Sequence, residues 1–185
     1  MPRCLVFSTV TDKERRAVAF KYWINVEKDY RTAIAYTGFD YDREEELDGI
    51  SNYFFNSSDK CNIKNFLTFF NYFKDESKHQ YDYYFLVNSN LLFPNYFLRD
   101  YFKEVKNIKA DISTPVFEKG SKYKKLTQRS NCRTFEIDSC SDEVVCLSKR
   151  AAKKLASLDK KAKFNTKTFD NLSFMAINFT PIKYV

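Results

Sequence analysis

Glycine is scarce in this chain of 185 residues, which contains only three, and that scarcity excludes two large classes of nucleotide site. Rossmann-type and P-loop phosphate sites need several glycines at fixed spacing, because the backbone there approaches the phosphates closely. Histidine is scarcer still, since His79 stands alone. One histidine excludes metal sites built from histidines, and no nucleophile elbow lies beside it. We expect His79 at the exposed end of a helix.

Paired cysteines and long apolar runs are also missing. The five cysteines are odd in number, irregular in spacing and contain no CxxC pair, so they indicate reduced thiols in a cytoplasmic protein. No stretch approaches the roughly 20 apolar residues that span a bilayer. The apolar run near Met1 is too short for a signal peptide. We therefore expect no membrane span.

Aromatic residues and positive charge are abundant instead. Phe and Tyr number 19 and 13, and the formal net charge is +7. The length fits one domain over residues 1–185 with a single large core, either complete or cut from a longer polypeptide. The charge fits an anionic partner such as a nucleotide, a nucleic acid or an acidic surface, although solubility alone would also explain it.

Apolar patterns predict strands that alternate with helices, and therefore an α/β domain around a mainly parallel sheet. The predicted strands are Cys4–Val10, Thr32–Thr37, Tyr83–Val87, Asp111–Phe117, Thr134–Asp138 and Glu143–Leu147. Helices are expected to begin at Thr11, to cover Ile63–Phe73, to follow Pro94 and to follow Ser148. The remaining expectations are an acidic connection over Asp40–Asp48, a mobile basic loop over residues 119–133 and a final apolar segment, Leu172–Phe179.

The strand Tyr83–Val87 is the most informative of these segments. It is continuously apolar and bounded by polar residues, as expected of a strand buried on both faces of a sheet. The triplet Asn88-Ser89-Asn90 follows it directly. Open α/β sheets bind ligands just beyond the carboxyl ends of their strands, so this triplet marks the expected site.

The same stretch resembles the strand-end motif of GT-A glycosyltransferases, the nucleotide-diphospho-sugar transferase superfamily. Tyr-Asp-Tyr precedes the apolar strand, an X-Ser-X triplet ends it, and Leu-Leu-Phe-Pro follows. The layout is similar from Cys4 to Leu158, but the motif itself covers only Tyr81–Pro94. The resemblance implies a single-domain GT-A-like three-layer sandwich that transfers a sugar from a nucleotide-diphosphate donor to an acceptor hydroxyl on a glycan or glycoprotein.

The resemblance also implies roles for particular residues. Donor-binding residues would be Ser8, Thr9, Asp40, Lys64, Asn88 and Asn90. Cations that compensate the diphosphate charge would be Lys122, Lys124, Arg129 and Arg133. Carboxylates placed to act as the base toward the acceptor would be Asp138, Asp142 and Glu143.

Asn88 and Asn90 stand where the superfamily commonly carries the two aspartates of its Asp-X-Asp motif. Neutral amides are poor ligands for hard cations, so we expect either no metal or a weakly held Mn²⁺ or Mg²⁺ at this pair. Asn-X-Asn followed by Leu-Leu-Phe also resembles the bacterial branch of the blood-group A/B transferase family, whose members work without metal. Metal-independent transfer is therefore the expectation.

Three alternatives stay open at this point. A nucleotidyltransferase would want a glycine-rich basic loop after the first strand, which Ser8–Asp12 does not provide. A non-catalytic protein that binds nucleic acid or nucleotides would suit the charge and the aromatic residues, although most aromatics fall on expected core faces. A transferase fold retained only for binding would bind the donor without turnover.

Overall fold

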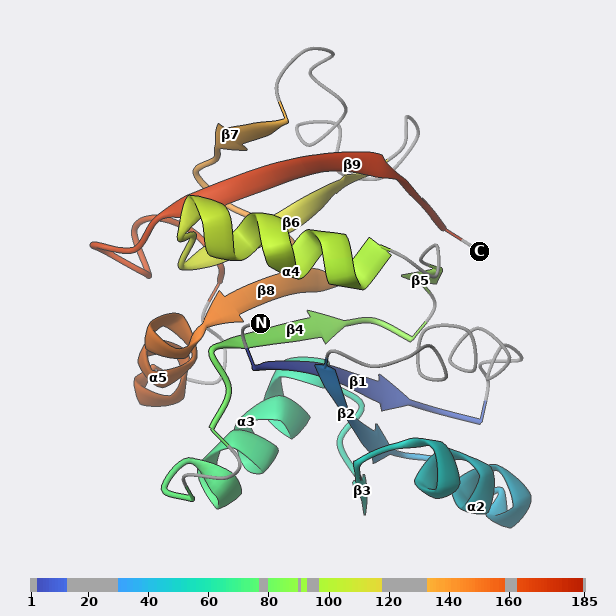
Figure 1. Ribbon diagram of the computed structural model, residues 1–185. Coiled ribbons are helices and arrows are strands. Elements are labelled where there is room, and N and C mark those ends of the chain that lie inside the picture. Colours follow the sequence, from blue (N-terminus) through green and yellow to red (C-terminus); the bar gives the residue numbers. More distant parts are fainter. Residues whose placement is uncertain are drawn as a thin grey trace.

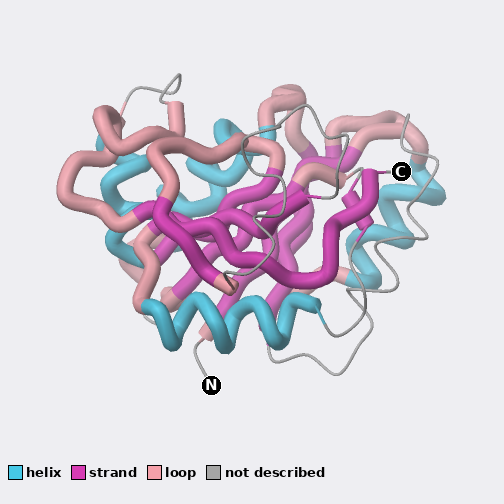
Figure 2. The backbone as a smooth tube through the Cα atoms, turned by 90° about the horizontal axis from the view of Figure 1, so that it is seen from above, coloured by secondary structure: helices cyan, strands magenta, loops and turns pink. Residues whose placement is uncertain are grey.

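The computed structural model describes residues 3–12, 30–76, 80–89, 91–92, 97–117, 133–158 and 163–184. A nine-stranded sheet passes through the middle of the molecule, and helices cover both of its faces (Figures 1 and 2). The strands are β1 (Cys4–Val10), β2 (Tyr30–Tyr36), β3 (Tyr53–Asn56), β4 (Tyr83–Val87), β5 (Leu91–Leu92), β6 (Ile112–Phe117), β7 (Thr134–Glu136), β8 (Val144–Ser148) and β9 (Phe174–Tyr184). The helices are α2 (Tyr41–Ile50), α3 (Asn62–Phe73), α4 (Phe97–Ile108) and α5 (Lys149–Ser157). The predicted three-layer α/β domain is confirmed.

The sheet is mixed, and its first half is parallel. Its strand order is β3-β2-β1-β4-β8-β6-β9-β5, with β7 paired to β9. Strands β3, β2, β1 and β4 run in one direction, whereas β8 runs antiparallel to both β4 and β6. Pro115 lies beside a register shift between β6 and β9, as a bulge and not at an edge of the sheet.

Strands β1 and β4 lie at the centre because their side chains are buried on both faces. All seven residues of β1 are buried, and so are the last four of β4. Along β1 the side chains alternate between two apolar clusters: Cys4 and Val6 face α4, whereas Leu5 and Phe7 face α3 and α5. This alternation makes the continuous apolar runs that identify buried parallel strands in the sequence.

Aromatic rings fill the space between the sheet and α3. Phe66 of α3 meets Phe7 edge-on, with ring centroids 5.6 Å apart, and meets Tyr84 of β4 at 5.5 Å. Such edge-to-face pairs are worth about 0.5–1.5 kcal/mol beyond the area they bury. These contacts hold α3 against β1 and β4.

Two elements differ from the sequence-based expectation. The acidic connection over Asp40–Asp48 is largely helix α2, and its N-cap is Asp40, whose side chain accepts a hydrogen bond from Arg43 N. Only Leu47 of this helix is buried, so its sequence carries no apolar periodicity to reveal it. Edge strand β3 was also missed. The helix expected to begin at Thr11 lies largely in residues 13–29, outside the described residues.

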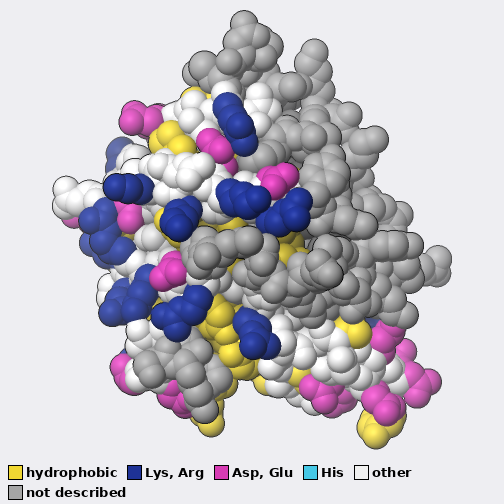
Figure 3. Space-filling model, viewed as in Figure 1, with side chains coloured by type: hydrophobic (Ala, Val, Ile, Leu, Met, Phe, Trp, Pro, Cys, Tyr) yellow, Lys and Arg dark blue, Asp and Glu magenta, His cyan; other side chains and the backbone are white. Residues whose placement is uncertain are grey.

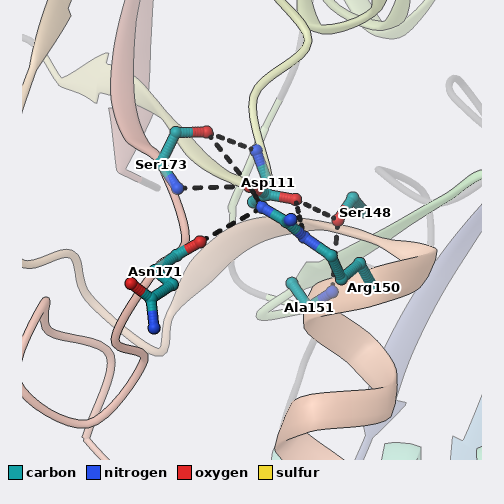
Figure 4. Close-up of polar contacts among 6 residues, drawn as sticks. All are labelled: Asp111, Ser148, Arg150, Ala151, Asn171 and Ser173. Atoms are coloured by element: carbon teal, nitrogen blue, oxygen red, sulfur yellow. Dashed lines mark hydrogen bonds and ion pairs between the residues drawn. The ribbon is translucent and has the colours of Figure 1, made fainter.

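A polar junction centred on Asp111 ties β6, β8, α5 and β9 together at the edge where β4 begins (Figure 4). The Asp111 carboxylate accepts hydrogen bonds from Nε and Nη2 of Arg150, from Ser148 Oγ at 3.0 Å and from Ser173 N at 3.2 Å. Its backbone N–H donates to Ser173 Oγ at 2.9 Å. Ser148 also caps α5, as predicted, by accepting from Ala151 N.

Asp111 stays ionised in this junction. Burial acts to raise the pKa of its carboxyl, but hydrogen bonds from Arg150, Ser173 and Ser148 outweigh that effect, and the pKa lies below its usual value. A carboxyl with a lowered pKa in the folded state contributes stability above its unfolded pKa of about 3.9, and the contribution is lost as the pH falls through the folded value.

We therefore expect Asp111→Asn to lower the free energy of unfolding by about 1–3 kcal/mol at pH 7, because charge-assisted hydrogen bonds are lost. Urea denaturation at pH 7 and at pH 3 measures this, and the difference from wild type should shrink at pH 3. Asp170→Asn is the matched control, since Asp170 is 63% exposed and pairs with Lys154 at the surface. Its effect should stay below about 1 kcal/mol. An equal loss in both variants would contradict the assigned role of the junction.

Candidate functional site

The carboxyl ends of β1 and β4 lie side by side. The order in which the chain adds strands to the sheet reverses between these two strands. From β1 the chain adds β2 and then β3 on one side, whereas β4 pairs with the other side of β1. Open α/β sheets bind their ligands at such a switch point, in the crevice beyond the strand ends. Asn88 and Ser89 follow β4 directly, so the structure places them where a ligand site is expected. Asn90 lies outside the described residues.

The peptide bond between Val87 and Asn88 is held from both sides. Its carbonyl oxygen accepts hydrogen bonds from Ser8 Oγ at 2.8 Å and from Asn62 Nδ2 at 3.2 Å. Its N–H donates to the backbone oxygen of Glu143 at 2.8 Å, where β8 is about to begin. The end of β4 is thus tied to β1 and α3 on one side and to the β8 entrance on the other.

A network of side chains joins the first turn of α3 to the end of β1. Thr9 Oγ1 donates to Asn62 Oδ1 at 3.0 Å and accepts from Asn65 Nδ2 at 3.1 Å. Asn65, which is buried, also receives a hydrogen bond of 2.6 Å from Ser57 Oγ. The hydroxyls of Ser8 and Thr9, predicted to contact the donor, therefore make their hydrogen bonds inside the protein, where β1 and β4 end.

The side chains just beyond β4 differ in accessibility. Asn88 is partly exposed, whereas Ser89 is only 3% exposed. Ser89 Oγ has no hydrogen-bond partner among the described residues. Buried hydroxyls are normally paired, so an orphan of this kind at a strand end is a polar atom available to a bound group or an ordered water.

A second polar cluster follows β1 and β2 on the same edge of the sheet. The Asp12 carboxylate accepts hydrogen bonds from the Tyr36 hydroxyl and, at 2.8 Å, from Phe39 N. The Tyr36 hydroxyl in turn accepts from Asp40 N at 3.1 Å. Gly38 packs closely against both groups, because a Cβ atom there would overlap the Asp12 carboxylate and the Tyr36 hydroxyl.

The pKa values of the Asp12 carboxyl and the Tyr36 hydroxyl are shifted in opposite directions. The hydrogen bond from Tyr36 lowers the pKa of the Asp12 carboxyl, while burial, with the same hydrogen bond, raises the pKa of Tyr36 to about 12. Both groups keep their ordinary protonation states at neutral pH. Asp40 was the residue predicted for this region, and Asp12 was missed because its only signal in the sequence is its place just after the first strand. Asp40 mainly caps α2, and Phe39 beside it is 98% exposed.

Two of the three carboxylates predicted to act as the base, Asp142 and Glu143, precede β8 at the point where it meets the end of β4. Glu143 accepts the Asn88 N–H through its backbone, and its own N–H donates to Ser141 Oγ at 3.0 Å. Asp142 precedes it and is exposed. Because β8 runs antiparallel to β4, its entrance meets the end of β4.

Asp138 lies elsewhere. It follows β7, which runs antiparallel to β9 and ends beside Phe174, where β9 begins. The register through β6 and β8 puts that point at the edge of the sheet where β4 begins. The structure thus does not bring Asp138 to Asn88, and we assign it no part in the site.

The predicted cations are only partly described. Lys122, Lys124 and Arg129 lie outside the described residues. Arg133 pairs with Glu104 of α4 at 3.1 Å. Lys64 pairs with Asp59 at 2.9 Å, and this hydrogen bond raises the pKa of the Lys64 ammonium. Lys64 lies in the first turn of α3.

Charge is unevenly spread over the surface. Lys and Arg side chains gather over α4 and α5, whereas acidic side chains gather over α2 (Figure 3). A cleft of about 410 Å³ lies beside the last turns of α3 and α5, with Phe70, Lys74 and Lys153 among its lining residues. None of its lining residues belongs to β1 or β4. Lys74, the C-cap residue of α3, also complements the dipole of that helix.

Two absences hold for the described residues alone. No three His, Cys, Asp or Glu side chains gather there as a set that could hold a metal ion. None of the helices they form is both long and apolar enough to cross a membrane. Asn88 offers an amide, which suits a hard divalent cation less well than a carboxylate does.

No protein-family model matches the chain, and no curated protein matches it in sequence. Solved structures do resemble it in fold. TarS from S. aureus superposes with a TM-score of 0.68 at 9% identity, over 97% of this chain and 36% of TarS. Residues 1–349 of TarS in complex with UDP-GlcNAc give 0.62 at 8% identity, over 100% of this chain and 58% of that one.

A third similar structure is CMP:2-keto-3-deoxy-manno-octonic acid synthetase in complex with CTP. Its TM-score is 0.62 at 5% identity, and the match covers 99% of this chain and 92% of the synthetase. The chain thus spans less than two thirds of the TarS structures but nearly all of the synthetase. At these identities the likeness shows the fold alone: the protein has the GT-A-like fold of nucleotide-sugar and nucleotidyl transferases.

Proposed function

We propose that the protein is a glycosyltransferase that binds a nucleotide-diphosphate sugar at the crevice between β1 and β4 and transfers the sugar to an acceptor hydroxyl on a glycan or glycoprotein. The observation that carries this proposal is the placement of Asn88, which leaves a buried strand at the switch point with its peptide bond held from both sides. The fold supports it, since one protein that shares it was solved with UDP-GlcNAc bound.

In the proposed reaction the acceptor oxygen bonds to the anomeric carbon as the bond from that carbon to the diphosphate breaks. The acceptor hydroxyl proton passes to a carboxylate, for which Glu143 or Asp142 is the candidate on the β8 side of the crevice. The diphosphate leaves with increased negative charge, so donors placed beforehand around it stabilise the transition state. The amides of Asn88 and Asn90 and the cations Lys122, Lys124 and Arg129 are the proposed donors.

A second candidate is a nucleotidyltransferase, because the chain covers nearly the whole length of the CTP-bound synthetase. That reaction joins a nucleoside monophosphate to a sugar acid and releases pyrophosphate. The segment Ser8–Asp12 contains neither a glycine nor a basic residue, and these are what such an enzyme needs beside a triphosphate. We therefore rank this reaction second.

A thermal-shift panel with UDP-GlcNAc, other nucleotide sugars and CTP, each with Mn²⁺ or with EDTA, tests the proposal. At a concentration a hundredfold above Kd, a ligand stabilises the folded state by about 2.7 kcal/mol. For a chain of this size that corresponds to a rise in Tm of about 5–10 °C.

We expect one nucleotide sugar to give this rise in EDTA as well as in Mn²⁺, with release of the nucleoside diphosphate on turnover. A rise with CTP alone, and pyrophosphate release with a sugar acid, would favour the nucleotidyltransferase. If no nucleotide shifts Tm but single-stranded RNA or DNA binds in a salt-dependent way, the protein is a nucleic-acid-binding protein and the proposal is wrong.

A further inference from the structure

Asn62, the first residue of α3, is the one described side chain that hydrogen-bonds to both strands of the switch point. Its Oδ1 accepts from Thr9 Oγ1 of β1 at 3.0 Å, and its Nδ2 donates to the Val87 oxygen of β4 at 3.2 Å. A carboxamide has an acceptor and a donor side by side, so it can serve two unlike partners at once.

The surrounding network fixes which way this amide points. Thr9 Oγ1 accepts from Asn65 Nδ2 at 3.1 Å, so its own hydrogen is directed to Asn62 Oδ1. The Asn62 NH₂ group then faces Val87 O. The reversed amide would place two oxygens against each other, so the chain from Asn65 through Thr9 to Asn62 has one favourable direction.

The hydrogen bond from Asn62 to Val87 O also constrains the peptide bond of Asn88. Two side chains, Ser8 and Asn62, donate to the carbonyl that precedes it, while its N–H is held by Glu143 O on the other side. Ser8 belongs to the buried strand β1, so the sheet fixes its position. Asn62 comes from a helix, so it adds a separate constraint against rotation of this peptide bond.

We propose that Asn62 is a positioning residue: it orients the Val87–Asn88 peptide so that Asn88 and Ser89 meet the diphosphate of the donor. This inference rests on the proposed function. A side chain that moves by about 1 Å forfeits much of the benefit of a pre-organised site, so loss of Asn62 should act on ligand affinity more than on folding.

The test compares Asn62→Leu with Asn71→Leu. Leucine has nearly the size of asparagine and no charge, so the variant removes both hydrogen bonds without adding a repulsion toward an anionic ligand. Asn71 is an exposed residue of the same helix, away from the crevice. Thr9→Val is a second variant, which removes the hydroxyl that directs the Asn62 amide and keeps its volume.

Two measurements are made on the whole chain: the Kd of UDP-GlcNAc, or of the nucleotide sugar that gives the largest thermal shift, and the exchange rate of the Asn88 amide by NMR without ligand. We expect Asn62→Leu to raise Kd about tenfold or more and to speed Asn88 exchange, with Thr9→Val acting in the same direction and Asn71→Leu matching wild type. Tm of Asn62→Leu should stay within a few degrees of wild type.

Wild-type affinity together with wild-type exchange in both crevice variants would overturn the inference. So would a rise in Kd that Asn71→Leu reproduces, because it would then be a general effect of altering α3. The proposed function fails separately, by the absence of nucleotide-sugar binding to the wild-type protein. In that case Asn88 exchange alone decides whether Asn62 positions the peptide.

Discussion

Gly38→Ala is expected to lower the free energy of unfolding by about 2–3 kcal/mol and Tm by about 5–10 °C. The added methyl group would overlap the Asp12 carboxylate and the Tyr36 hydroxyl, which hydrogen-bond to each other. Tyr36 is 1% exposed and cannot move into solvent. The loop must therefore give up the Asp12 contacts, including the one to Phe39 N.

Gly49→Ala is the matched control, and it should shift stability in the opposite direction. Gly49 lies within α2, and a Cβ atom there meets nothing within 4 Å. Alanine is favoured over glycine in a helix by about 0.5–1 kcal/mol, so this variant should be more stable than wild type. Chemical denaturation of the three proteins gives the comparison. Equal stability of Gly38→Ala and wild type would show that the loop has another conformation of similar energy.

The double variant Asn88→Asp, Asn90→Asp is expected to make nucleotide-sugar binding depend on a divalent cation. Two carboxylates beside a diphosphate repel it, so affinity in EDTA should fall at least about tenfold, or ~1.4 kcal/mol. Carboxylates bind hard cations well, so Mn²⁺ should bridge them to the diphosphate and restore affinity. Titration calorimetry with and without Mn²⁺ measures both effects.

Asn88→Ala, Asn90→Ala separates charge from loss of the amides. This variant should bind the donor more weakly than wild type in EDTA and should gain nothing from Mn²⁺, because it has neither amides nor carboxylates. It should remain folded, since Asn88 is partly exposed. Unchanged donor affinity in the alanine variant would count heavily against the role given to this pair.

Much of the fold follows from apolar patterning. The run Tyr83–Val87 predicts a buried strand, and the spacing of apolar residues over Ile63–Phe73 predicts a helix. Both are confirmed, and the apolar residues of each are largely buried in the core. Helix α2 and strand β3 could not be predicted from apolar patterning. Leu47 is the single buried residue of α2, and β3 is a short edge strand in which no side chain is buried.

The candidate site is less predictable than the fold. The place of Asn88 follows from the strand before it. The inward hydrogen bonds of Ser8 and Thr9 do not, because their partners Val87, Asn62 and Asn65 lie more than 50 residues away in the chain. The position of Asp138 likewise depends on how β7 pairs with β9, which no local pattern reveals.

The reversed direction of β8 has a consequence for how such a protein can diversify. Because β8 enters the sheet at the carboxyl edge of β4, the residues around Asn88 come from chain segments far apart in sequence: residues 8–12 and 57–65 on the β1 side, and residues 141–143 on the β8 side. Insertions ahead of β8 can therefore reshape one side while the other keeps its geometry. Under the proposed function, selection for a new recipient molecule would then leave recognition of the activated sugar untouched.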